Sequence, residues 1–188
     1  MEDINTIVHN AFEVIKNGGV ILYPTDTVWG LGCDATHAEA VQKIYNIKKR
    51  SLNKSMIILV NERLMHQVFT DIPEVAWQII DLSEKPTTLI LDNPKLVDKT
   101  LIAEDNSLGV RLIKESFCHR LIEKMKKPLV STSANISNEA TPKSFKEIHP
   151  DIIEAVDYVV PLYQDKICDK PSTIIKLTHD SQVKIIRK

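Results

Sequence analysis

The sequence predicts an α/β fold in which one mixed β-sheet is flanked by helices. Short apolar runs typical of strands alternate with segments of helical periodicity, and strand-like runs dominate the C-terminal third. The chain has 188 residues, 43% hydrophobic and 26% charged, which is an ordinary globular composition and enough chain for a well-buried core. No repeat, low-complexity tract or linker divides it, so we expect one domain over residues 1–188.

The helices are predicted from apolar residues that recur three or four positions apart. The first spans Ile4–Lys16 and is followed by two glycines, a common signal for the end of a helix. A second helix begins near Ala38. A third follows Pro73, because proline is favoured in the first turn of a helix. A fourth covers about residues 115–126.

The strands are predicted from short, mostly apolar runs. Val20–Tyr23 is apolar on both faces, as expected of a strand covered on both sides, and Pro24 ends it. Further strands are expected at residues 56–60, 87–91, 108–112, 128–132, 157–160, 173–177 and 183–187.

The charge, the cysteines and the apolar segments argue against a disulfide-bonded, secreted or membrane-spanning protein. Lys and Arg number 24 and Asp and Glu 25, so the net charge of -1 predicts no partner by itself. Cys33, Cys118 and Cys168 are odd in number and widely spaced, which indicates reduced thiols. The N-terminal residues lack the features of a secretory signal, and no apolar stretch approaches the roughly 20 residues that cross a bilayer. We therefore expect a cytoplasmic protein with no membrane partner.

The most unusual segment is YPTDTVWGLG at residues 23–32. It places hydroxyl groups and glycines directly after a buried strand, and loops at strand ends in open α/β sheets commonly bind ligands. An ordinary turn containing Pro and Asp explains the same composition. The P-loop, the dinucleotide-binding glycine motif and the common zinc-protease and hydrolase motifs are absent, so a bound nucleotide would have to be held by other residues.

A basic run follows the second predicted helix. If that helix ends near Ile47, Lys48 and Arg50 can project to the same side, and such a pair suits a polyphosphate. The alternative is a solvated basic helix end that complements the helix dipole.

Strand parity groups further polar residues. Ser107, Gly109 and Arg111 share one face of a predicted strand, where a glycine would leave room for the arginine to hold a carboxylate. A solvent-facing arginine on a half-exposed strand is the alternative.

A second polar group follows the strand that begins at residue 128. Ser131, Ser133 and Asn135 share one face, and their hydroxyl and carboxamide groups can hold phosphate or ribose oxygens. Ser172 similarly precedes a strand. A turn rich in Ser and Asn is the alternative here.

Taken in order, these segments resemble the YrdC/TsaC family of threonylcarbamoyl-AMP synthases. The resemblance rests on YPTDTVWGLG, K-x-R, SLGVR, STSAN with Thr141-Pro142 behind it, and PSTIIK with a late arginine. It runs from about Val20 to Arg187, nearly the whole chain. The length fits the short, single-domain form of the family.

The resemblance implies a twisted, open sheet with a concave, positively charged face. It implies a reaction that joins L-threonine, bicarbonate and ATP into threonylcarbamoyl-AMP with release of pyrophosphate. Transferase proteins would then pass the threonylcarbamoyl group to the adenosine beside the anticodon of tRNA. Such a site mainly positions reactants and neutralises charge, which agrees with the lack of a recognisable nucleophile.

The resemblance also implies a role for each motif residue. The implied catalytic residues are Lys48, Arg50 and Arg111. The residues implied to contact threonine or its carbamate are Thr25, Arg111, Ser131 and Ser172. The residues implied to contact ATP are Lys48, Arg50, Ser107, Ser133, Asn135, Thr141 and Arg187.

Two of these expectations need further conditions. Arg187 shares strand parity with Val183 and Ile185, so it needs a bend or a bulge to leave the core side.

Mg²⁺ is expected as a cofactor because ATP normally carries it. No carboxylate stands out as its ligand, although Asp26 and Asp34 are nearby in the sequence.

Three positions depart from the family pattern. Ser51 stands where proline commonly follows K-x-R, Ile113 begins the stretch that replaces a proline-histidine pair, and Asn138 replaces a frequent glycine. A divergent, YciO-like paralogue that binds double-stranded RNA or tRNA without synthase activity is therefore an alternative, as is an ATPase indifferent to threonine. RNA binding would need a local basic patch, formed by Lys48, Lys49, Arg50, Lys54, Lys124, Lys126 and Lys127.

Overall fold

The computed structural model describes residues 3–52, 54–168, 170–178 and 182–188. Its strands are β1 Ile21–Tyr23, β2 Gly30–Gly32, β3 Ile57–Val60, β4 Thr87–Asp92, β5 Ser107–Leu112, β6 Leu129–Ser133, β7 Tyr158–Val159, β8 Thr173–Leu177 and β9 Val183–Arg187. Its helices are α1 Ile4–Lys16, α2 Ala38–Ile47, α3 Glu62–Val68, α4 Glu74–Leu82, α5 Ser116–Met125 and α6 Pro150–Ala155, with short 3-10 turns at Lys99–Leu101 and Phe145–Glu147.

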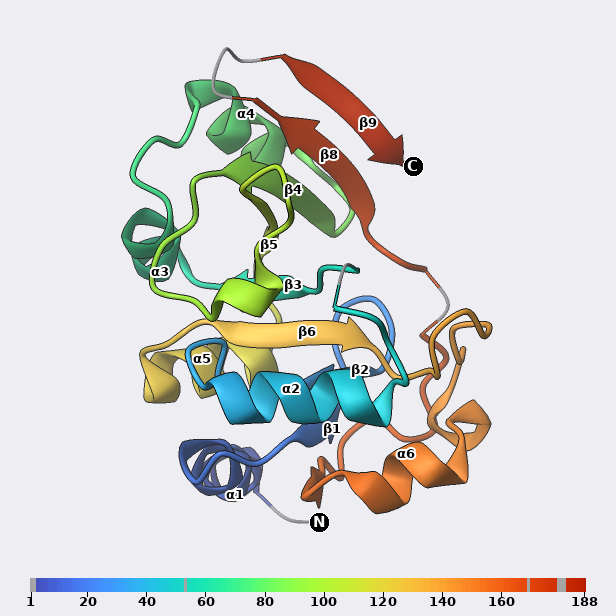
Figure 1. The fold of residues 1–188 in the computed structure, drawn as a ribbon. Helices are drawn as coiled ribbons and strands as arrows, with labels where there is room; N and C mark the ends of the chain where they lie inside the picture. The colour runs from blue at the N-terminus through green and yellow to red at the C-terminus, as the bar shows by residue number, and fades with distance from the viewer. Residues whose placement is uncertain (1–2, 53, 169, 179–181) are drawn as a thin grey trace.

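The strands form one sheet in the order β7-β1-β2-β6-β3-β5-β4-β8-β9 (Figure 1). The pairs β1 with β7, β3 with β5 and β4 with β8 are parallel, and the other neighbours are antiparallel. Figure 1 shows β8 and β9 at one end of the sheet and α1 and α6 at the other. The predicted α/β fold with a mixed sheet is confirmed.

The predicted helical periodicities are also confirmed. Helix α1 has the predicted bounds, Asp3 caps its N-terminus, and it buries one apolar stripe that includes Ile7 and Ala11. Helix α2 ends at Ile47, as the proposed convergence of the following cations requires, and the chain turns away through Lys49 at a φ of 48°. Among the described residues, no helix is long and apolar enough to cross a membrane.

Two α-helices and one strand were not predicted. Helices α3 and α6 are seven and six residues long, too short to show clear periodicity. Strand β2 reads Gly-Leu-Gly, a composition typical of turns. Close packing explains Gly32, because a Cβ at this position would lie 2.7 Å from both the Tyr23 ring and the Val130 carbonyl oxygen.

The last strand contains the irregularity that Arg187 was predicted to need. Ile175 pairs with Ile185, but Ile174 pairs with Arg187, so Ile186 is an extra residue in β9. A bulge of this kind reverses the alternation of side chains across a strand. Arg187 therefore points to the same side as Ile174.

Gly109 lies in β5 where the sheet has no room for a side chain. A Cβ at this position would be 2.7 Å from Cγ2 of Ile57, a stiff β-branched side chain on the neighbouring strand. Gly109→Ala is expected to lower the free energy of unfolding by about 1–3 kcal/mol, measured by urea denaturation. Adding Ile57→Ala removes the clashing methyl group, so the double variant should lose less than the sum of the single variants. An unchanged urea midpoint for Gly109→Ala would contradict this packing.

Candidate functional site

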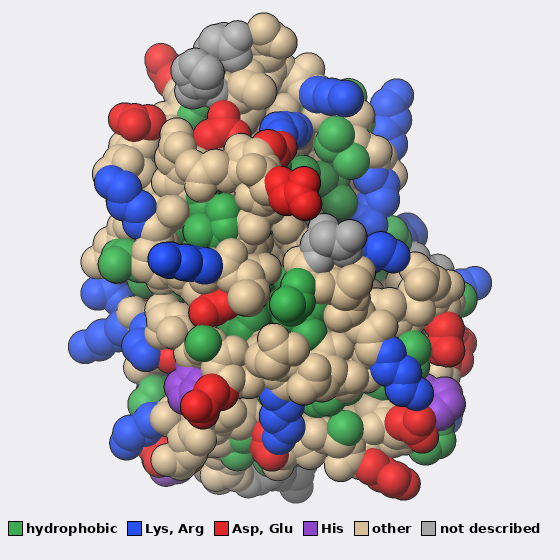
Figure 2. Space-filling view, viewed as in Figure 1, with side chains coloured by type: hydrophobic (Ala, Val, Ile, Leu, Met, Phe, Trp, Pro, Cys, Tyr) green, Lys and Arg blue, Asp and Glu red, His purple; other side chains and the backbone are tan. Residues whose placement is uncertain are grey.

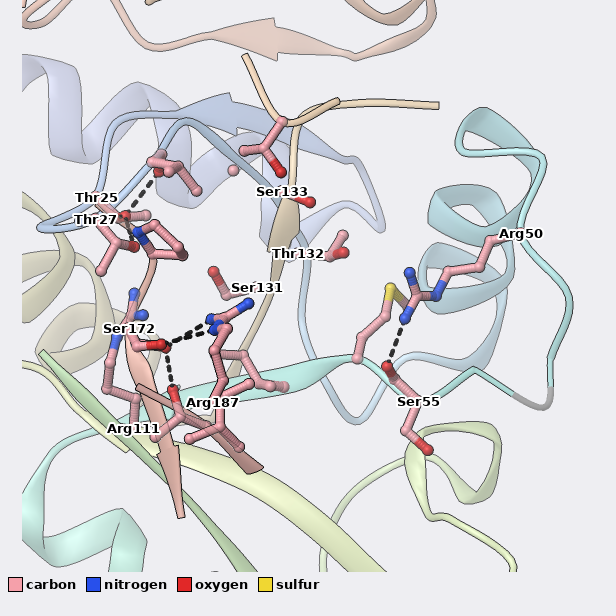
Figure 3. A pocket seen from close by; sticks show the side chains of 18 residues that line it. Thr25, Thr27, Arg50, Ser55, Arg111, Ser131, Thr132, Ser133, Ser172 and Arg187 are labelled. Carbon is pink, nitrogen blue, oxygen red and sulfur yellow. Dashed lines mark hydrogen bonds between the residues drawn. The ribbon is translucent and has the colours of Figure 1, made fainter. Parts of the chain in front are cut away.

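A cavity of about 290 Å³ lies between β4, β5, β6 and β8 and the loop that joins β1 to β2 (Figure 3). Three arginines and nine Ser or Thr residues line it, with no acidic residue among the described residues at its wall. The predicted site residues that line it are Thr25, Arg50, Arg111, Ser131, Ser133, Thr141, Ser172 and Arg187. Lys48, Ser107 and Asn135 do not.

Thr25 orders the loop after β1. Its hydroxyl donates to the Val28 carbonyl at 2.7 Å, accepts the Thr27 amide at 3.0 Å, and lies 2.9 Å from the Thr27 hydroxyl. Pro24 and this local hydrogen bonding fix the turn. The turn holds Thr25 and Thr27 at the cavity wall. The Thr25 hydroxyl already makes hydrogen bonds within the loop, so it would contact a ligand in addition to these bonds.

Arg111 is a buried cation at the cavity wall. The glycine-containing face of β5 carries it, as strand parity predicts, and its side chain is 4% exposed. Its Nη2 lies 3.0 Å from Oδ1 of Asp26, and its buried Nε has no hydrogen-bond partner in the structure. A buried guanidinium with an unused donor is suited to bind an anion, since leaving such a donor unpaired is costly.

Arg187 and Ser172 meet beside Arg111, as Figure 3 shows. Arg187 donates from Nε to the Ser172 carbonyl at 2.9 Å and from Nη2 to the Ser172 hydroxyl at 3.4 Å. That hydroxyl lies 2.8 Å from the hydroxyl of Thr88. Burial, and secondarily the like charge of Arg111, lower the pKa of Arg187. Two cations at this end of the cavity therefore lie close enough to repel each other, and a bound anion would relieve that repulsion.

Arg50 lines the other side of the cavity. Its Nε donates to the Lys54 carbonyl and its Nη2 to the Ser55 carbonyl, both at 2.8 Å. Figure 3 shows Arg50 and Ser55 well separated from Arg111 and Arg187, with Ser131, Thr132 and Ser133 between the two groups. The cavity thus has two cationic ends joined by hydroxyl groups, which fits a ligand, or a pair of ligands, with negative charge at both ends.

Lys48 lies behind the cavity wall. Its side chain is 1% exposed. Its Nζ donates to the carbonyl oxygens of Ser133 and Asn135, the second at 2.7 Å, and lies 3.3 Å from Oδ1 of Asn135. Burial, with a smaller contribution from the charge of Arg50, lowers the pKa of Lys48 to about 7. Lys48 therefore supports the turn that carries Ser133, and Arg50 is the member of the K-x-R pair that reaches the cavity.

Asn135 and Ser107 likewise make contacts inside the protein. Asn135 accepts the Ser133 hydroxyl at 2.5 Å and donates to the Glu139 carbonyl at 2.8 Å, which closes the loop after β6. Ser107 is buried at the start of β5 and donates to the carboxylate of Asp105 at 2.5 Å. Strand parity identified the correct face for Ser107 but not its distance from the cavity.

Sequence reasoning missed other cavity residues, notably Thr27, Ser55 and Thr88. Thr27 belongs to the YPTDT segment and could have been found by including every hydroxyl of that segment. Thr88 is the second residue of β4 and has no motif around it, so only its contact with Ser172 identifies it.

The structure explains one departure from the family pattern and locates another. Asn138 has a φ of 70°, a conformation in which glycine is easiest and asparagine is tolerated. Its Oδ1 accepts the Lys54 ammonium at 2.8 Å and so joins the K-x-R loop to the loop after β6. Ile113 is buried after β5, with its amide bonded to the Val60 carbonyl.

Most of the basic residues proposed as an RNA-binding patch have partners within the chain. Lys48 is buried, Lys54 bonds to Asn138, and Lys127 lies 2.6 Å from the carboxylate of Asp34. Lys124 lies over the Phe12 ring. Figure 2 shows Lys and Arg scattered among Asp and Glu on the face seen in Figure 1, and grouped along the edge formed by β8 and β9.

The two carboxylates considered near a metal are engaged elsewhere. Asp26 pairs with Arg111, and Asp34 bonds to Lys127 and Thr36. Within the described ranges, no group of three or more His, Cys, Asp and Glu side chains could hold a metal ion.

Comparison with known proteins agrees with this architecture. A family model that groups Sua5, YciO and YrdC proteins, described as "Telomere recombination", matches residues 13–188. A Methanocaldococcus jannaschii protein to which threonylcarbamoyl-AMP synthase activity is ascribed is 35% identical over 173 residues, covering 91% of this chain and 80% of that protein. The threonylcarbamoyl-AMP synthase of Xanthomonas oryzae is 32% identical over 155 residues, covering 80% of this chain and 83% of that protein.

Solved structures match the fold closely. P. abyssi Sua5 complexed with L-threonine is 25% identical with a TM-score of 0.79, and the match covers 94% of this chain and 52% of that one. This chain thus spans about half the length of Sua5. E. coli YciO has the same fold, with a TM-score of 0.83 at 24% identity over 100% of this chain and 91% of that one. The length of the family match and the identity to curated relatives show that this chain belongs to the Sua5/YciO/YrdC family.

Proposed function

We propose that this chain is an L-threonylcarbamoyl-AMP synthase. One observation carries the proposal: the cavity is lined by three arginines and nine hydroxyl side chains, with its cations at two separate ends. L-Threonine with its carbamate and ATP together present a carboxylate at one end and a triphosphate at the other. The synthase names of the curated relatives favour this reading over RNA binding without catalysis.

In the proposed reaction, the amine of L-threonine combines with bicarbonate to give a carbamate and water. A carbamate oxygen attacks the α-phosphorus of ATP, the bond to the β-phosphate oxygen breaks, and pyrophosphate leaves. The protein supplies no nucleophile, so its contribution is to align the two substrates and stabilise negative charge on the α-phosphate and the leaving pyrophosphate. Mg²⁺ would enter with ATP as part of the substrate. The reaction class is adenylyl transfer.

The roles follow from position in the cavity. Arg111, with Arg187 beside it, would hold the threonine carboxylate or the carbamate, and Arg50 would contact the phosphates of ATP. For Arg187 this replaces the ATP contact that the family resemblance implies, because it lies beside Arg111 and Ser172. Thr25, Ser131 and Ser172 lie near the first group, and Ser133 and Thr141 belong to the ATP side. Lys48 and Asn135 would act by holding the loop that carries Ser133, which modifies the direct contacts that the family resemblance implies for them.

The product is a mixed anhydride that hydrolyses readily, so a second protein must consume it. We propose that tRNA threonylcarbamoyl transferase proteins take it up and modify the adenosine beside the anticodon.

The function is tested by pyrophosphate release from MgATP and bicarbonate with L-threonine, with L-serine and with no amino acid. The proposal expects release that requires both L-threonine and bicarbonate. Release that is the same without an amino acid would indicate an ATPase of other specificity. No release from folded protein, together with salt-dependent binding of double-stranded RNA, would favour the RNA-binding alternative.

Arg50→Ala is expected to lower the rate or the affinity for ATP about 10- to 150-fold, because the variant loses one charge-assisted contact with the phosphates. The KM for threonine should change much less, because Arg50 lies at the opposite end of the cavity from Arg111. Steady-state kinetics with each substrate varied in turn separate the two effects. Lys49→Ala is a suitable control, because Lys49 is exposed and does not line the cavity. An unchanged KM and kcat for Arg50→Ala would remove Arg50 from the ATP site.

A further inference from the structure

The loop after β1 sends alternate residues in opposite directions. Thr25 and Thr27 line the cavity, whereas Asp26 between them lines a second hollow of about 270 Å³. The same alternation occurs in β5, where Arg111 lines the cavity and Leu112 lines the second hollow. The two spaces therefore lie back to back, and the ion pair between Asp26 and Arg111 connects them.

This ion pair is asymmetric in its exposure to water. The Arg111 side chain is 4% exposed and the Asp26 side chain 25% exposed, with 3.0 Å between Nη2 and Oδ1. Nε of Arg111 is buried without a partner, and Asp26 is the only side chain recorded in an ion pair with this arginine among the described residues. The carboxylate thus approaches the guanidinium from outside the cavity and fixes one of its terminal nitrogens. A planar guanidinium held at one nitrogen has a restricted set of directions for its remaining donors.

We propose that Asp26 is a positioning residue that sets the orientation of the Arg111 guanidinium for binding the carboxylate or carbamate of the amino-acid substrate. The inference rests on the proposed function, because it assumes that Arg111 contacts that substrate. Asp26 itself does not line the cavity, so it acts through Arg111 and not on the reacting atoms.

The charges around Asp26 determine when it can play this role. Burial raises the pKa of Asp26, while Arg111 opposes the rise; more weakly, Glu115 raises it and Lys166 lowers it. The second hollow adds the charged residues Glu84, Lys85 and Lys114. As the pH falls, Asp26 takes up a proton at a higher pH than an ordinary aspartate does. Below that point Arg111 loses its ionic partner, so substrate affinity should fall on the acid side.

Two substitutions separate positioning from simple support of the fold. In Asp26→Asn the carboxamide oxygen can still accept the Arg111 Nη2 hydrogen, so the geometry is retained without the charge. In Asp26→Ala both are lost. We expect the KM for L-threonine to rise on the order of 10-fold or more in Asp26→Ala and less in Asp26→Asn, with the KM for ATP nearly unchanged. The acid limb of the pH profile of kcat/KM for threonine should disappear in Asp26→Asn.

Asp157→Asn is the matched control, because Asp157 forms an ion pair with Lys43 at 2.6 Å and does not line the cavity. It should lose some stability and keep the KM for threonine. Equal increases of the KM for threonine and for ATP in Asp26→Ala, or a wild-type KM for threonine in folded Asp26→Ala, would overturn the positioning role. These results differ from failure of the proposed function, in which the wild-type protein itself shows no threonine-dependent release of pyrophosphate.

Discussion

Arg111→Ala is expected to reduce kcat/KM for L-threonine on the order of 10²- to 10³-fold, the largest loss of activity among the cavity residues. Arg111 is the most deeply buried of the cavity arginines, and its Nε has no hydrogen-bond partner among the described residues. Removing it deletes the charge opposite the substrate carboxylate and also leaves Asp26 without its ionic partner. Pyrophosphate release at varied threonine concentrations measures the loss.

Two further variants show whether this loss is specific. Arg111→Lys keeps the positive charge but not the planar, two-pronged donor group, so it should recover only part of the activity. Arg120→Ala removes an exposed arginine whose recorded partner is Asn5, and it should retain wild-type kinetics. Urea denaturation must show that Arg111→Ala is folded under assay conditions. A folded Arg111→Ala protein with wild-type kcat/KM would exclude Arg111 from the substrate site.

Lys48→Met is expected to lower the free energy of unfolding by about 2–4 kcal/mol and to reduce activity through the loop that carries Ser133. Methionine roughly preserves the volume of the lysine stem but cannot donate to the carbonyl oxygens of Ser133 and Asn135. Each buried acceptor left unpaired costs about 1–3 kcal/mol. Lys49→Met changes an exposed neighbour on the same turn, so it should have little effect on either property.

The pH dependence of stability distinguishes Lys48 from an ordinary surface lysine. Burial lowers its pKa from 10.5 to about 7 in the folded protein. Above pH 7 the folded chain therefore binds fewer protons at this site than the unfolded chain, whose lysine stays charged until about pH 10.4. The contribution of Lys48 to stability thus rises with pH from about 7 towards 10.

The measurement is the free energy of unfolding from about pH 6.5 to 8.5, a range that lies below the ordinary titration of Tyr. Cys titrates at about pH 8.5, but it does so in the wild type and the variants alike and cancels in the comparison. Wild-type protein should become more stable relative to Lys48→Met as the pH rises, and Lys49→Met should follow the wild type. Parallel pH profiles for the wild type and Lys48→Met would show that Lys48 does not titrate in this range.

The sequence predicted most of the regular elements because their signals are local. The periodicity of Ile4–Lys16 and the apolar runs of the central strands survive in the structure with nearly the same bounds. Strand β2 could not be predicted, because Gly32, which gives it a turn-like composition, is required by Tyr23 and Val130 on neighbouring strands. Contacts of that kind depend on the register of the sheet, which the sequence does not display.

The candidate site was predictable to the extent that strand parity decides it. Parity placed Arg111 and Ser131 on the cavity side, and it showed that Arg187 needs the bulge found at Ile186. Strand parity predicts which face of the sheet a side chain lies on, but not how deeply the side chain is buried or how far it lies from the cavity. It could not show that Lys48 is buried against carbonyl oxygens 85 and 87 positions further along the chain.

The central claim is that this cavity joins threonine, bicarbonate and ATP in one product. The most direct test is mass spectrometry of the adenylate formed from L-threonine, MgATP and ¹³C-bicarbonate, with Arg111→Ala assayed in parallel. The account predicts threonylcarbamoyl-AMP that carries the isotope in its carbamoyl carbon, together with pyrophosphate, and greatly reduced product from the variant. Release of AMP or ADP with no labelled adenylate from folded wild-type protein would contradict it.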